Sequence, residues 1–252
     1  MAIVETIRLV DDFGYVERTL TSKNSLLPII HYLFMSNKEV QFASKVIYKD
    51  DRALIKRWLH TVLLKRIFGG QADTVLKLIR DVVREKLSTG ISVFPAHEIA
   101  ERLSKTRKSI TMDQETINNL LQTTYEDRYA FPILALLSPH LDFKNNDFNV
   151  DHIFPLSHFS SYNLKSAGVL NKPEGDYYTN YFFYNGIVNL QMLDANENKS
   201  KSDKTFEDWA KAANIDFEKY LLPKITDFNR FPEFINLRRD ILKKKMEEVL
   251  KF

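Results

Sequence analysis

The chain has 252 residues, 44% of them hydrophobic, which is enough for one large domain or two small ones and excludes a disordered tail. It has no cysteine, which excludes a disulfide framework and a thiolate zinc site, and its net charge of +3 alone indicates no particular partner. Because no apolar run approaches the roughly 20 residues that cross a bilayer, and no charged leader opens the sequence, we expect a soluble, cytoplasmic protein without a membrane partner.

Residues 1–140 are predicted to form a helical domain. Apolar residues recur at helical spacing after Asp51, and Gly69-Gly70 ends that pattern. Further helices are expected at 25–35, from an N-cap at Asp73, from Pro95, from a capping box at Thr111 to Gln114, and at 129–137. Together these segments predict a helical bundle.

Residues 141–252 are predicted to form a second domain that contains two short strands and a C-terminal helix. The expected elements are a strand at 148–153, a long loop at 157–180, the turn dipeptide Asn185-Gly186, a strand at 187–193, a polar turn or helix at 196–204, a helix capped at Thr205 and a final helix from about 232 to 250. The fold class is therefore mainly α, of the α+β type.

Five polar residues in this second part occur in an order that suits metal-dependent cleavage of a phosphodiester: Asp151, His152, Asn189, Asn198 and Lys201. Such cleavage needs a base for water, a divalent cation on a phosphate oxygen and a positive charge near the leaving group. The imidazole of His152 titrates near neutral pH, so we predict that it is the base. Asp151 and Asn198 would supply hard oxygen ligands, which favour Mg²⁺, with Mn²⁺ as a substitute, over zinc.

The two neighbours Asp151 and His152 would point to opposite faces of a regular strand, so we expect them at its end, shortly before Pro155. The second ring nitrogen of His152 needs an acceptor, and we expect a backbone carbonyl of the loop between the strands. Asn189 would hold that loop through its amide, and Lys201 would contact a phosphate or the leaving oxygen.

These residues resemble the ββα-metal motif of HNH endonucleases. The shared pattern is Asp-His-Ile-x-Pro at 151–155, an asparagine in a hydrophobic strand, and Asn-x-x-Lys nine residues beyond it. It is similar to the HNH domain of RNA-guided CRISPR nucleases, and it is closer in layout to the C-terminal HNH domain of GmrSD-type restriction endonucleases. The motif covers roughly residues 141 to 210, and the helical flanks resemble the family in pattern only.

The resemblance implies that His152 is the base, that Asp151 and Asn198 bind Mg²⁺, and that Asn189 is structural within the site. It implies DNA as the substrate, 5′-phosphate and 3′-hydroxyl products, and a role in restriction or phage defence against foreign or modified DNA. The family's nucleotide-dependent domain has no counterpart in these residues, so we expect it elsewhere in a larger protein or in a separate subunit. Double-strand cutting by one such site would suit a dimer or sequential nicking.

A different class of function remains open beside the nuclease. An isolated Asp-His pair is usually structural, and a non-catalytic nucleic-acid-binding or interaction module with an HNH fold is the alternative. The ordered set of five residues favours the nuclease. The aromatic residues between 177 and 184 could stack on bases, but packing beneath the long loop is the preferred role.

Overall fold

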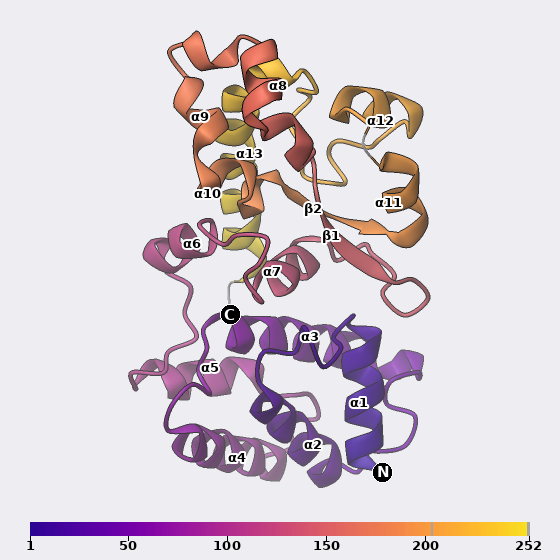
Figure 1. Cartoon of the computed structure of the whole chain (residues 1–252). Helices are drawn as coiled ribbons and strands as arrows, with labels where there is room; N and C mark the ends of the chain where they lie inside the picture. Colours follow the sequence, from indigo (N-terminus) through magenta and orange to yellow (C-terminus); the bar gives the residue numbers. More distant parts are fainter. Residues whose placement is uncertain (203, 251–252) are drawn as a thin grey trace. The chain divides into compact units, whose positions relative to one another are not determined.

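The structure is a computed structural model that describes residues 1–202 and 204–250 (Figure 1). The chain divides into two compact units. Unit 1 comprises Met1–Met112, Asp142–Asn145 and the C-terminal residues from Val249, and unit 2 comprises Asp113–Leu141 and Asn146–Glu248. The described residues are mainly helical and contain one two-stranded sheet, which confirms the predicted class. None of the described helices combines the length and the apolar character needed to cross a membrane.

Unit 1 is a group of helices around an apolar core. They are α1 (Ala2–Asp12), α2 (Leu26–Met35), α3 (Lys49–Leu64), α4 (Ala72–Ser88) and α5 (Ala96–Ser104). Helix α3 is the most buried of them, and its Trp58, Leu59 and Val62 have no exposed surface. The sequence patterns did not predict α1, which nevertheless buries Leu9 and Val10.

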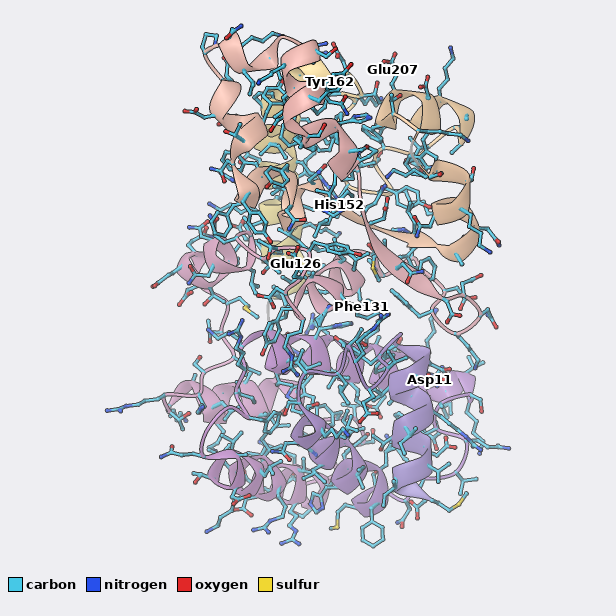
Figure 2. The ribbon with its side chains drawn as sticks, viewed as in Figure 1. Asp11, Glu126, Phe131, His152, Tyr162 and Glu207 are labelled. Carbon is cyan, nitrogen blue, oxygen red and sulfur yellow. The ribbon has the colours of Figure 1, made fainter. Side chains whose placement is uncertain are left out.

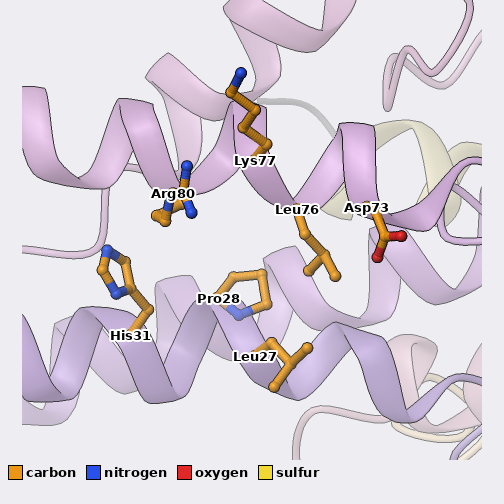
Figure 3. A pocket seen from close by; sticks show the side chains of 7 residues that line it. All are labelled: Leu27, Pro28, His31, Asp73, Leu76, Lys77 and Arg80. Carbon is orange, nitrogen blue, oxygen red and sulfur yellow. The ribbon is translucent and has the colours of Figure 1, made fainter.

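A hollow of about 350 Å³ lies between α2 and α4 in unit 1. Figure 3 shows the side chains that line it: Leu27, Pro28 and His31 from α2, and Asp73, Leu76, Lys77 and Arg80 from α4. Burial lowers the pKa of His31, and the positive charges of Arg84 and Arg80 lower it further. The positive charges of Arg80 and Arg84 disfavour a cation there, so this hollow is unlike the metal site that the sequence predicts.

Unit 2 contains the sheet. Its elements are α6 (Gln114–Leu120), α7 (Ala130–Leu137), β1 (Phe148–His152), α8 (Ser161–Ser166), α9 (Gly175–Thr179), α10 (Tyr181–Tyr184), β2 (Leu190–Asp194), α11 (Ala195–Lys201), α12 (Phe206–Ala212) and α13 (Phe231–Val249). Strands β1 and β2 are antiparallel and lie side by side in Figure 1, with His152 opposite Leu190. Helices α6 and α7 belong to this unit, and α7 packs against both strands. From the sequence, both had been placed in the helical domain of residues 1–140.

Four local expectations for the chain were wrong. The segment 157–180 is not an irregular loop, because it contains α8 and α9. The strand expected at 187–193 begins instead at Leu190, because Ile187–Asn189 form a short 3₁₀ turn after the Asn185-Gly186 dipeptide. Helix α6 is capped by Asp113, whose side chain accepts from the Thr116 amide, and not by Thr111. Similarly, α4 begins after Gln71, and Asp73 lies within its first turn.

Aromatic packing forms the core of unit 2. The Phe154 ring, which follows β1, meets those of Phe206, Phe231 and Phe234 at centroid distances of 5.1, 5.4 and 4.9 Å. Tyr178 is only 1% exposed, so this member of the aromatic segment packs in the core as expected. The buried Arg238 of α13 donates to the carbonyl oxygens of Val188 and Leu190 and so fixes the start of β2. The end of β1 and the start of β2 are therefore held by the same core.

Candidate active site

The structure places Asp151 and His152 at the end of β1, where the sequence expects them. Their side chains contact different elements, as the alternation of a strand requires. Asp151 contacts Lys201 at the end of α11, and His152 contacts Asn185 just after α10. The end of β1 therefore connects two polar clusters, one through each of these two side chains.

Asp151 and Lys201 form an ion pair of unequal exposure. Lys201 Nζ lies 2.6 Å from Asp151 Oδ2, and it also donates to the carbonyl oxygen of His152. The Lys201 side chain is 2% exposed and the Asp151 side chain 24%. The ammonium thus faces the carboxylate within the protein.

Helix α11 begins directly after β2 through a capping box. The Asp194 side chain accepts from the Asn196 and Glu197 amides, and the Glu197 carboxylate accepts from the Asp194 amide. Asn198 precedes Lys201 by three residues, so the two side chains share one face of α11. The half-buried Asn198 amide makes no side-chain hydrogen bond to another described residue. Asn198 therefore has oxygen-donor capacity one turn before the lysine that binds Asp151.

Asn189 has the opposite character, because its whole amide is bound to backbone. Its Oδ1 accepts from the Phe154 amide at 3.0 Å, and its Nδ2 donates to the carbonyl oxygens of Phe154 and Tyr184 at 3.0 and 2.7 Å. The residue has no exposed surface. Asn189 thus holds the chain that follows His152 and has no free face for a substrate.

The acceptor for the His152 ring is a side chain. The sequence-based prediction of a backbone carbonyl acceptor was wrong. His152 Nε2 lies 2.7 Å from Asn185 Oδ1. Asn185 Nδ2 in turn donates to both Glu126 oxygens, at 3.0 and 2.8 Å, and Tyr181 donates its hydroxyl proton to Glu126 Oε2 at 2.7 Å. Figure 2 marks His152 and Glu126 in unit 2. Neither Glu126 nor Asn185 was a candidate from the sequence, where Asn185 was interpreted as a turn residue.

A short backbone pairing brings Glu126 to Asn185. The Tyr125 amide donates to the Asn185 carbonyl oxygen at 2.9 Å, and the Ile187 amide donates to the Thr123 carbonyl oxygen at 2.7 Å. Gly186 lies within this pairing, and a Cβ at that position would be 1.9 Å from the Phe182 carbonyl oxygen. Glycine is therefore required here for close approach of the backbone, and not for a turn with positive φ.

Burial of the imidazole favours its neutral form. Burial lowers the pKa of His152 and Lys201 lowers it too, while the Asn185 hydrogen bond and the charges of Asp151 and Glu126 partly oppose this. The Glu126 carboxyl has a lowered pKa, chiefly because Tyr181 donates a hydrogen bond to it. At neutral pH the cluster therefore holds an ionised Glu126 beside a neutral His152, which is the form a base needs.

The described residues contain no group of three or more His, Cys, Asp or Glu side chains that could hold a metal ion. Oxygen donors at the site come instead from one carboxylate and one amide. Asp151 Oδ1 has no hydrogen-bond partner among the described residues, and the Asn198 amide is similarly open. Mg²⁺ is commonly held by one or two protein oxygens, with water and substrate phosphate completing its shell, so this donor set fits it.

A comparison with curated proteins found no match to the chain. A family model described as GmrSD restriction endonucleases, C-terminal domain, matches residues 94–245. That range is more than half of the chain and includes all the residues of both polar clusters. The chain therefore belongs to the family of GmrSD restriction endonuclease C-terminal domains.

Proposed function

We propose that this chain is a Mg²⁺-dependent HNH endonuclease that hydrolyses DNA phosphodiester bonds as the nuclease part of a restriction system acting on foreign or modified DNA. Family membership supports a restriction nuclease. The observation that carries the chemistry is an imidazole, His152, oriented by Asn185 at the end of β1, directly after a partly exposed carboxylate, Asp151.

Each residue of the site then has one task. His152 takes the proton of the attacking water at the ring nitrogen that does not face Asn185. Mg²⁺, or Mn²⁺ in its place, held by Asp151 and Asn198, would polarise the scissile phosphate and offset charge at the leaving oxygen. Lys201 holds the Asp151 carboxylate through Oδ2, so Oδ1 would remain available to a cation. This ammonium is therefore assigned to positioning, because it would have to leave a buried place to reach a phosphate.

Nicking of supercoiled plasmid DNA tests this function. The wild-type chain is expected to nick with Mg²⁺ or Mn²⁺ and to stop when EDTA is added. His152→Ala is expected to lower the rate about 100-fold or more, the usual loss when a general base is removed. His97→Ala is the matched control, since His97 is an exposed histidine on α5.

Two results would contradict the proposal. Equal nicking by His152→Ala and wild type would remove His152 from the mechanism. A folded wild-type chain that binds DNA and cuts neither strand with either ion would favour the non-catalytic binding module instead.

A further inference from the structure

The hydrogen bonds around His152 determine which of its ring nitrogens carries the proton. A carboxylate only accepts hydrogen bonds, so Glu126 must face the NH₂ group of Asn185. The Asn185 oxygen is thereby turned toward His152 Nε2 at 2.7 Å, and an amide oxygen also only accepts. The proton of neutral His152 therefore lies on Nε2, and the lone pair lies on Nδ1.

We propose that Glu126 is a positioning residue that acts through Asn185 to keep His152 in the Nε2–H tautomer, so that Nδ1 is the nitrogen that accepts the proton of the attacking water. This assignment rests on the proposed function for its catalytic meaning. The tautomer itself rests only on the three side chains and their donors.

Further contacts keep this chain of hydrogen bonds in register. Tyr181 donates to Glu126 Oε2, which limits rotation of the carboxylate. The Tyr125 ring packs against the imidazole, with centroids 4.8 Å apart and planes inclined by 34°. The charged groups that act on His152 are Glu126, Asp151 and Lys201. Of these, Glu126 alone reaches the ring through Asn185, so it alone selects the tautomer.

Replacing Glu126 with a residue that only donates should reverse the tautomer. In Glu126→Lys the ammonium would bind the Asn185 oxygen, turn the amide, and present its NH₂ group to Nε2, which must then accept. Glu126 is exposed, so the fold should tolerate the change. We expect nicking to fall about 10- to 100-fold, as for other partners that orient a functional histidine. Glu115→Lys, an exposed position on α6, makes the same charge change as a control.

A second substitution should restore the tautomer. In Glu126→Lys with Asn185→Asp, the new carboxylate accepts from both the lysine and His152 Nε2. Most of the activity should return, and the acidic limb of the rate profile should move up by about one pH unit, because a carboxylate then adjoins the imidazole. A merely structural role for Glu126 predicts neither the rescue nor the shift.

Nitrogen-15 NMR of the histidine rings provides a readout that needs no catalysis. Above its pKa, wild-type His152 should show a protonated Nε2 and an unprotonated Nδ1, and Glu126→Lys should show the reverse. A wild-type ring protonated at Nδ1, or a Glu126→Lys chain that nicks within twofold of wild type, would overturn the proposal. If the wild type cuts no DNA, the proposed function fails, and the NMR result alone decides the tautomer.

Discussion

Among the residues that the structure describes, two Asp–Lys pairs in which one partner is almost fully buried differ in what is left unbound. In unit 1, Lys38 lies 2.8 Å from Asp51, whose carboxylate is 4% exposed and also accepts from the Tyr32 hydroxyl and the Phe94 amide. In unit 2, Lys201 lies 2.6 Å from Asp151, but Asp151 is 24% exposed and keeps one oxygen free among the described residues. The first carboxylate is fully used by the fold, whereas the second can still accept a ligand.

The histidines of the two units differ in the same way. His60 in unit 1 is 1% exposed and contacts Tyr15, and burial lowers its pKa to about 3. Burial also lowers the pKa of His152, but Asn185, Asp151 and Glu126 oppose that effect. His60 therefore stays neutral at any ordinary pH, while His152 can exchange a proton. Burial alone does not distinguish a structural residue from a functional one. What distinguishes them is whether the side chain can still accept a ligand or a proton.

The largest effect is expected when the carboxylate of the Lys38–Asp51 pair is removed. Asp51→Ala would leave the Lys38 ammonium, the Tyr32 hydroxyl and the Phe94 amide without their shared acceptor. Breaking a buried pair from one side typically costs about 3–5 kcal/mol, and we expect a loss of that size in the free energy of unfolding. Urea denaturation followed by circular dichroism measures it. Asp50→Ala, the exposed neighbour, should change stability by less than about 1 kcal/mol; equal losses would remove the distinction.

A smaller effect is expected when the lysine of the Lys201–Asp151 pair is replaced. Lys201→Met removes a buried ammonium and leaves Asp151 with access to water, so the expected loss is about 1 kcal/mol. Lys38→Met leaves Asp51 charged and almost fully buried, so its loss should be two- to threefold larger. The same urea titration compares the two variants. A larger loss for Lys201→Met would show that Asp151 is as enclosed as Asp51.

The local parts of the site were predictable from the sequence. The placement of Asp151 and His152 at a strand end depends on a short polar and apolar alternation followed by Pro155. The helix cap at Thr205 follows from one side chain and the amide of Asp208. Such signals depend on a few consecutive residues, so one sequence is enough to find them.

The residues around the imidazole were not predictable in this way. Asn185 is 33 positions after His152, and Glu126 is 59 positions before Asn185. They meet only because the backbone near Thr123 pairs with Ile187, which is a tertiary event without a local pattern. Asn185 also stands before a glycine, which suggested a turn. The two Asp–Lys pairs likewise look alike in sequence, and only their packing distinguishes them.

The smallest effect is expected in how the free energy of unfolding depends on pH, where His60 and His152 should differ. His60 is neutral in the fold and takes a proton in the unfolded chain below about pH 6.5, so its stabilisation is complete above that pH and is lost on acidification toward a pKa of about 3. Between pH 6.5 and 5.5 this loss approaches about 1 kcal/mol. His60→Gln keeps an acceptor for Tyr15 and does not titrate, so urea titrations at the two pH values should show that much less acid sensitivity than wild type. His152→Gln should remove less of the dependence of stability on pH, because Asn185, Asp151 and Glu126 oppose the lowering of the His152 pKa. It should nevertheless abolish nicking. If His60→Gln loses as much stability between the two pH values as wild type, His60 is protonated in the folded chain.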